Sequence, residues 1–336
     1  MKKYLLLFFV IFSVVSFGGD IDEQILAKAK RSKLIPIPTD PQKQLELVKN
    51  KYIKSATLPL NVATIELGKE LWFDPRLSST GQVSCNTCHD LNTYGVDGLE
   101  VAVGVDGQLN PNGVNSPTVY NSIFNQTQFW NGRAKTLAEQ AGGPLTAPFE
   151  MNSTPQSVEK VVNSIKGYKD SFEQIAPGRK IDFDLVSEAI AIFEATLITT
   201  SRYDEYLEGN LNALTHEEKE GFLTFLNLGC AICHNGINLG GSMQIFELAA
   251  PFDRRDIGVL QKDSFGRTKV PTLRNITQTY PYFHNGAVVD IEDAVTTMGK
   301  VQLGITVDKA DIEKINKFFQ TLDGKPPYIE MPKLPK

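Results

Sequence analysis

Two short stretches of sequence decide the fold of this chain: CNTCH at residues 85–89 and CAICH at residues 230–234. Both spell C-x-x-C-H, which is the attachment motif of c-type haem. Cysteines three positions apart lie on one face of a helical turn, where both thiols can form thioethers with the haem vinyl groups. The adjacent histidine then reaches the iron as its proximal ligand. The sequence therefore predicts two covalently bound haem c groups, with His89 and His234 as iron ligands.

The two motifs use all 4 cysteines of the chain. The thioether positions are Cys85, Cys88, Cys230 and Cys233. Zinc sites and dithiol redox centres also use paired cysteines. A zinc site does not require a histidine directly after each pair, and a thioredoxin-like dithiol follows a strand in a βαβ unit. The histidine that follows each pair here favours haem over both alternatives.

The composition is that of a folded, water-compatible protein of 336 residues, with 41% hydrophobic and 22% charged side chains. Disordered and collagen-like architectures are excluded by these fractions. The net charge of −5 comes without any basic run. Because nucleic-acid binding needs a basic surface, we expect no nucleic-acid partner.

The N-terminus resembles an export signal. Lys2 and Lys3 precede an apolar run over residues 4–17, which is shorter than the about 20 residues that span a bilayer. Residues 1–19 are therefore interpreted as a secretory signal peptide, with an uncleaved membrane anchor as the alternative. We expect no membrane span in the mature chain.

An internal repeat divides the remaining chain. Residues 117–121 recur as 271–275, and residues 129–132 recur as 283–286, both at an offset of 154 positions. We therefore expect a mainly α fold with two cytochrome c-like haem domains. The predicted limits are an N-terminal haem c domain at 20–200 and a C-terminal haem c domain with its tail at 201–336.

Helices and long loops are both expected around the haems. Apolar residues keep helical spacing from Val158 to Phe172 and from Val186 to Leu197. Residues 91–132 and 235–289 are rich in Gly, Asn and Pro with weak periodicity, so they are predicted to be long loops that carry function.

The halves differ in the residue available as a sixth iron ligand. Met298 follows the second repeat, and the repeat register places Pro144 opposite it in the first half. Methionine is a common axial ligand that raises the reduction potential of a His-ligated haem. Met243 is the rival ligand. Because neither His nor Met lies between His89 and Met151, the first iron is expected to keep an open position for a substrate.

Several segments resemble the bacterial dihaem cytochrome c peroxidase family, which is related to MauG. The likeness extends over about residues 45–325. The segments that carry it, besides the two haem motifs, are Leu67–Ser78, Asn115–Thr118, Gln128–Ala134, Lys269–Asn275 and Pro281–Gly286.

This resemblance implies a periplasmic enzyme that reduces hydrogen peroxide to water, with electrons from a small cytochrome c or cupredoxin. It implies that His234 and Met298 hold the electron-accepting iron and that His89 holds the peroxidatic iron. Trp130 matches the family tryptophan that lies between the haems as an electron relay. Glu150 matches the distal acid, with Gln140 beside it.

The resemblance also implies a calcium ion between the haem domains. Its ligands would be Asn115 and the backbone carbonyls of Thr279 and Pro281, which suits a hard, oxygen-seeking cation. His284 matches a family histidine near the electron-accepting haem that does not bind iron. Homodimerisation and the identity of the electron donor stay open.

One departure from the family pattern concerns activation. Family members that rest in an inactive form carry a distal histidine where this chain has Val105. Valine cannot bind iron, so we expect that reductive activation by expulsion of that histidine is absent or altered. Tyr94 is the alternative ligand.

Two other functions remain as alternatives. The first is a MauG-like oxidase of a partner protein. The missing distal histidine favours this reading, whereas Met298, in place of an axial tyrosine, argues against it. The second alternative is a dihaem electron carrier in which both irons are six-coordinate.

Overall fold

The computed structural model of the chain describes residues 20–52, 56–250 and 261–336. The predicted signal peptide, 1–19, lies outside the described residues. The described part is mainly helical, as predicted. Its α-helices are α1 (Ile21–Arg31), α2 (Pro41–Tyr52), α3 (Val62–Phe73), α4 (Cys85–Cys88), α5 (Leu137–Thr146), α6 (Pro155–Ser164), α7 (Lys166–Ile175), α8 (Phe183–Glu194), α9 (Arg202–Leu207), α10 (His216–Asn227), α12 (Ile291–Met298) and α13 (Lys309–Phe319).

Strand structure is short. Strand β1 (Met243–Ile245) pairs antiparallel with β2 (Arg267–Lys269), and Met243 lies opposite Lys269. The stretches predicted to be long loops, 91–132 and 235–289, hold this hairpin and short 3₁₀ turns in their described parts. None of the described helices combines the length and the apolar character that crossing a bilayer requires.

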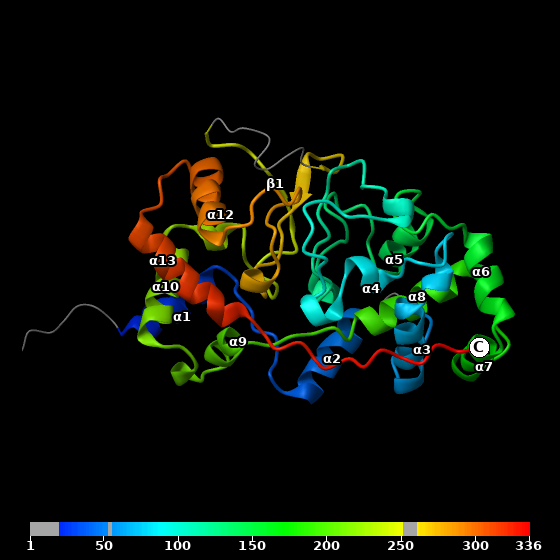
Figure 1. Cartoon of the computed structure of the whole chain (residues 1–336). Helices are drawn as coiled ribbons and strands as arrows, with labels where there is room; N and C mark the ends of the chain where they lie inside the picture. Colours follow the sequence, from blue (N-terminus) through cyan, green and yellow to red (C-terminus); the bar gives the residue numbers. More distant parts are fainter. Residues whose placement is uncertain (1–19, 53–55, 251–260) are drawn as a thin grey trace, which may run out of the picture.

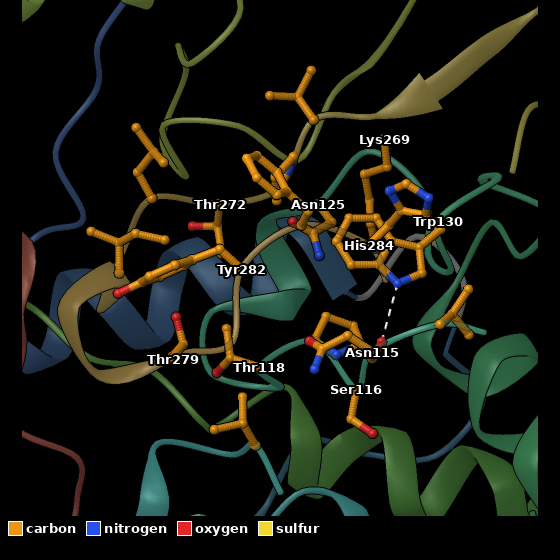
Figure 2. A pocket seen from close by; sticks show the side chains of 18 of the residues that line it. Asn115, Ser116, Thr118, Asn125, Trp130, Lys269, Thr272, Thr279, Tyr282 and His284 are labelled. Atoms are coloured by element: carbon orange, nitrogen blue, oxygen red, sulfur yellow. Dashed lines mark hydrogen bonds between the residues drawn. The ribbon is translucent and has the colours of Figure 1, made fainter. Parts of the chain in front are cut away.

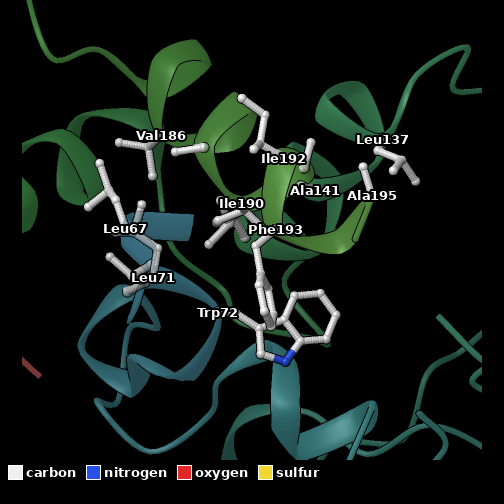
Figure 3. Packing of buried hydrophobic residues seen from close by; sticks show 14 of the residues in the cluster. Leu67, Leu71, Trp72, Leu137, Ala141, Val186, Ile190, Ile192, Phe193 and Ala195 are labelled. Atoms are coloured by element: carbon white, nitrogen blue, oxygen red, sulfur yellow. The ribbon is translucent and has the colours of Figure 1, made fainter. Parts of the chain in front are cut away.

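The first hydrophobic cluster is built where α3 crosses α8 (Figure 3). Trp72 of α3 meets Phe193 of α8 edge to face, with 5.9 Å between ring centroids. The two helices come close at Gly68, where a Cβ atom would lie 2.1 Å from the carbonyl oxygen of Ala189. Only glycine allows this approach, because any side chain would overlap the backbone of α8.

The second cluster repeats this arrangement with α10 and α13. Phe222 of α10 and Phe318 of α13 stack with 4.4 Å between centroids. Gly221 permits the crossing, since a Cβ atom there would lie 2.0 Å from the carbonyl oxygen of Lys314. Each cluster thus depends on one glycine at its central helix crossing.

The first described helix and the C-terminal tail pack on opposite clusters (Figure 1). Helix α1 lies against α10, and its Ile25 belongs to the second cluster. The C-terminal tail runs to the first cluster, where Leu334 packs and Arg76 Nη1 donates to the Pro335 carbonyl at 3.0 Å. The domain limits 20–200 and 201–336 therefore stay a prediction, and chain segments cross them at both ends.

The sequence repeat has a counterpart in the backbone. Phe129 and Phe283, 154 positions apart, both adopt a left-handed conformation, with φ of 64° and 66°. Asn121 and Asn275 share the same offset and conformation, with φ of 62° and 59°. Their side-chain amides both donate to Thr199 Oγ1, at 2.9 and 3.0 Å. Two equivalent turns thus meet at one residue of the linker between the halves.

The helical stripe from Val158 to Phe172 forms two helices rather than one. α6 ends at Ser164, Ile165 is extended with φ −97° and ψ 116°, and α7 begins at Lys166. A Cβ at Gly167 would lie 2.5 Å from Pro335, so the break lies where the C-terminal tail approaches. Likewise, α8 ends at Glu194 and leaves Leu197 in the linker.

Candidate haem and catalytic site

One cavity of about 560 Å³ is lined by both C-x-x-C-H motifs. Its lining includes residues of α4, α5, α12, strand β2 and the long loops. Every residue that the sequence predicts for the site lines this cavity: Cys85, Cys88, His89, Asn115, Trp130, Gln140, Glu150, Cys230, Cys233, His234, Thr279, Pro281 and Met298. The structure therefore brings together residues that are more than 200 positions apart.

The cysteine and histidine geometry suits covalent haem. All four thiols are free, and Cys85 and Cys88 form a single turn, α4, with the i, i+3 relation that thioether attachment needs. His89 Nδ1 donates to the Gly95 carbonyl at 3.2 Å, and His234 Nδ1 donates to the Leu239 carbonyl at 3.1 Å. This bond fixes the tautomer and leaves Nε2 of each ring as the metal-binding nitrogen.

Burial keeps both imidazoles neutral. It lowers the pKa of His234 to about 4, and it also lowers the pKa of His89. The carbonyl acceptors of Gly95 and Leu239 counteract this effect in part. A neutral imidazole is the form that binds iron, so both rings are prepared as proximal ligands.

Trp72 provides an independent test of whether these residues fit haem. Its ring lies 6.2 Å from that of His89, and it lines the same cavity. The indole is 2% exposed, and its buried Nε1 has no hydrogen-bond partner among the described residues. An orphaned buried donor is costly. The unpaired Nε1 of Trp72 therefore indicates that a hydrogen-bond acceptor is expected in the cavity, and the carboxylates of haem would supply one.

Sequence reasoning assigned no role to Trp72. The available signal was its rarity, because the chain has only 2 tryptophans, and the other is Trp130. Two buried charged residues of the cavity, Glu194 and Lys269, were also missed as site residues. Glu194 lies within an apolar helical stretch and Lys269 within a polar one, so local sequence gave no sign that both side chains meet the same cavity.

The two halves place different residues at equivalent positions of this cavity. Pro144 lies in α5 and Met298 ends α12, and both line the cavity. The N-caps of these helices, Thr136 and Asp290, are 154 positions apart, which is the offset of the sequence repeat. The register that paired proline with methionine therefore has a structural counterpart. Met298 as an iron ligand stays a prediction.

The rival ligands lie elsewhere. Neither Met243 nor Tyr94 is among the described residues that line the cavity. The Met243 side chain lies against the Gly132 turn, where a Cβ atom would meet its Sδ at 2.7 Å. Tyr94 is left-handed, with φ 58°, and its carbonyl accepts from Thr118 Oγ1 at 2.6 Å.

Glu150 lies in the turn that follows α5. Burial raises the pKa of its carboxyl group, and the positive charge of Arg133 partly opposes this shift. A carboxyl group with a raised pKa can exchange a proton closer to neutral pH. Gln140, on α5, lines the same cavity.

The backbone of Val105 contacts the backbone of Glu150. Val105 is not among the described residues that line the cavity. Its amide donates to the Glu150 carbonyl at 2.8 Å, and its side chain is buried in the first hydrophobic cluster. The backbone of the neighbouring Gly104 also packs closely against the turn that contains Glu150. A Cβ atom at Gly104 would lie 2.1 Å from the Phe149 carbonyl oxygen. The loop that contains Val105 thus supports the backbone of Glu150.

Trp130 is held between segments of both halves (Figure 2). Its Nε1 donates to the Asn115 carbonyl at 3.2 Å, and its ring meets that of His284 edge to face, with centroids 6.0 Å apart. The backbone N–H of Asn115 in turn donates a hydrogen bond to the His284 carbonyl at 2.7 Å. Lys269 Nζ lies 5.9 Å from the Trp130 ring centroid.

The residues expected to bind calcium all line the cavity. Asn115 Nδ2 donates to the Leu99 carbonyl at 2.7 Å, which orients the side-chain amide. Thr279 and Pro281 line the same cavity. Within the described ranges, no group of three or more His, Cys, Asp or Glu residues is arranged to hold a metal ion. A cation bound by the three predicted residues would therefore depend on amide and carbonyl oxygens, which calcium accepts.

Comparisons with known proteins show what this chain is similar to. The family model of di-haem cytochrome c peroxidase matches residues 62–212. A relative from Nitrosomonas europaea, named cytochrome c551 peroxidase, is 44% identical over 84% of this chain and 86% of its own length. One of the same name from Pseudomonas aeruginosa is 44% identical over 82% of this chain and 83% of its own.

A solved structure shows the same fold at lower identity. It is a MauG-like protein associated with microbial copper homeostasis, with a TM-score of 0.69 and 24% identity over 80% of this chain and 91% of its own. The relatives at 44% identity show the family, and its named members are oxidoreductases. This chain belongs to the di-haem cytochrome c peroxidase family.

Proposed function

We propose that this protein reduces hydrogen peroxide to water in the periplasm, consuming two electrons and two protons for each peroxide. The observation that carries the proposal is the inequality between the halves, because Met298 and Pro144 occupy equivalent positions of one cavity. One half offers a sixth ligand and the other leaves room for a small substrate. The relatives named cytochrome c551 peroxidase and the signal-like N-terminus support the assignment.

Haem, when bound, supplies the iron redox chemistry, and the chain supplies positioning and proton transfer. Cys85 and Cys88 would tether one haem and Cys230 and Cys233 the other. His89 would hold the peroxidatic iron, while His234 and Met298 would hold the electron-accepting iron. Trp130, which contacts Asn115 and His284 from the two halves, would relay electrons.

Glu150 is the proposed acid and base. Breaking the O–O bond requires that a proton leave the near oxygen and reach the far oxygen, which then departs as water. Glu150 can accept that proton as a carboxylate and return it as a carboxylic acid. Its raised pKa brings the two forms closer in energy at neutral pH. Gln140 is the neighbouring polar group that would orient the peroxide.

The proposed electron donor is a small cytochrome c or cupredoxin. The net charge of −5 favours a donor with a basic or neutral contact surface. We further propose a calcium ion held by Asn115 and by the carbonyls of Thr279 and Pro281, where it would join the two halves. A homodimer is the assembly that we propose to test first.

Spectroscopy and turnover test this proposal together. Optical and EPR spectra of the oxidised and half-reduced protein should reveal one high-spin iron, and peroxide should oxidise a reduced small cytochrome in the presence of the enzyme. Two six-coordinate irons at every oxidation level would instead establish an electron carrier. Oxidation of a partner protein without turnover of the cytochrome would establish a MauG-like oxidase, which the missing distal histidine at Val105 favours.

A further inference from the structure

Lys269 has an unusual environment for a lysine. It ends strand β2 and is 6% exposed. Its backbone amide donates to the Trp130 carbonyl at 2.9 Å, and its ammonium lies 5.9 Å from the Trp130 ring centroid. The pairing of Met243 with Lys269 in the hairpin fixes this position further. The side chain is therefore held beside Trp130 by backbone contacts on two sides.

The charge of Lys269 lacks a close carboxylate partner. It forms no ion pair with any residue in the described ranges, and the acidic group whose charge acts on it is Glu194, which lines the same cavity. Burial lowers the pKa of Lys269 to about 8. The negative charge of Glu194 opposes this shift, and the positive charge of Arg133 adds to it. An unpaired buried ammonium is costly, and proteins compensate it with an anion or a hydrogen-bond acceptor.

The cavity itself indicates which anion is missing. Among the described residues that line it, Lys269 is the one lysine or arginine. Each haem carries propionate side chains, so two haems bring several carboxylates into a cavity that is otherwise largely apolar. A single cation beside Trp130, where both halves meet, is the natural partner for one of these carboxylates.

We propose that Lys269 binds a propionate of one of the two haem groups, at the edge of the cavity next to Trp130 (Figure 2). The contact would neutralise both charges and position that haem edge against the indole. This inference requires the haem groups of the family but not the peroxidase reaction. Its test can therefore fail or succeed independently of the proposed function.

Reduction potential is the first readout. A nearby cation disfavours the ferric state, so its removal should lower the potential of the haem whose propionate it binds. We expect Lys269→Met to shift the ferric/ferrous ratio of one haem about tenfold, which is about 59 mV for a one-electron couple. Potentiometric titration followed by haem absorbance, without peroxide or donor, measures this.

Two matched variants define the outcome. Lys269→Arg keeps the charge and should retain a potential close to that of the wild type. Lys262→Met removes an exposed lysine from the segment that precedes β2, and it should leave the reduction potentials of both haems unchanged. If Lys269→Met leaves the potentials of both haems at their wild-type values, the proposal is overturned.

Resonance Raman spectra of the propionate bending modes provide a second measurement that does not depend on the stability of Lys269→Met. Lys269→Arg changes the hydrogen-bond donor but keeps the charge, so it is the variant expected to remain folded and loaded with haem. We expect the bending mode of one propionate to shift in this variant. An unchanged spectrum would show that Lys269 does not contact a propionate.

Discussion

Arg274 and Asp204 form a buried bidentate ion pair, with both N–O distances at 2.8 Å and side chains 1% and 0% exposed. The carboxylate also accepts the backbone amides of Ile37 at 2.7 Å and Ser201 at 2.9 Å. Arg274 Nε donates to the Ile237 carbonyl at 2.7 Å. One charge pair thus joins three segments: the one after α1 that contains Ile37, the one before α9 that contains Ser201, and the loop after the second haem motif that contains Ile237.

Removal of the Arg274 charge should be strongly destabilising. Arg274→Met leaves the Asp204 carboxylate buried without its partner, so we expect the free energy of unfolding to fall by about 3–5 kcal/mol. Urea denaturation of the haem-loaded protein measures this. Lys309→Met, which breaks an exposed pair with Glu313, is the control and should cost less than about 0.5 kcal/mol. Equal losses in both variants would contradict the role of the buried pair.

Glu150→Gln should abolish proton transfer while leaving the haem spectra intact. We expect peroxidase turnover to fall roughly 10² to 10⁴-fold, the usual contribution of a general acid–base group. Steady-state oxidation of a reduced cytochrome measures the loss. Glu139→Gln changes an exposed glutamate of the same region, outside the cavity lining, and should retain activity.

Arg133→Met should move the pH profile of the same reaction. The positive charge of Arg133 lowers the pKa of Glu150 against the opposing effect of burial. Its removal raises that pKa further. Because the carboxylate must first accept a proton, the acid limb of kcat/KM should move to higher pH. A limb that stays in place or moves to lower pH would exclude Glu150 as the titrating base.

Substitution of Met298 and Met243 distinguishes the two candidate iron ligands. Met298→His replaces a thioether with an imidazole, so the potential of the second haem should fall, because His/Met ligation holds it higher. Met243→Leu should leave that potential unchanged, since Met243 packs on the Gly132 turn. Potentiometric titration provides the measurement, and a fall only in the Met243 variant would reverse the assignment.

Glu194 should make stability depend on pH. Burial raises its pKa from 4.5 to about 7, while Ser122 and Lys269 oppose this shift. Between these two values the folded state binds the proton more tightly than the unfolded state, so this contribution to stability is lost as pH rises. Relative to Glu194→Gln, the wild type should lose on the order of 3 kcal/mol across this window. Urea denaturation of both proteins at pH 4.5 and 7.5 tests the difference, and parallel curves would refute it.

Gly221→Ala tests the helix crossing of the second cluster. The added methyl group would overlap the Lys314 carbonyl, so α10 and α13 must separate, at a cost of about 1–3 kcal/mol. Thermal unfolding measures the cost. Glu217→Ala adds no atom at the crossing and serves as the control on the same helix, where little change is expected. A variant as stable as this control would show that the crossing adapts freely.

Local sequence was sufficient for features that depend on neighbouring residues. The spacing of Cys85, Cys88 and His89 within one turn predicts haem attachment, because that chemistry needs only a few consecutive residues. The capping box that Thr215 and Glu218 form at the start of α10 likewise depends on residues only three positions apart. The offset of 154 positions placed Met298 opposite Pro144, because a repeat carries register along the chain.

Other features required the folded chain. No local pattern indicated that α1 would pack on α10 or that Leu334 would reach the first cluster. Trp72 and Lys269 are 197 positions apart, and only the tertiary structure brings them to one cavity. The orphaned indole nitrogen and the unpaired ammonium arise from burial, which depends on distant segments. Residue spacing therefore predicts where haem would attach, whereas packing between distant segments determines which polar groups line the cavity.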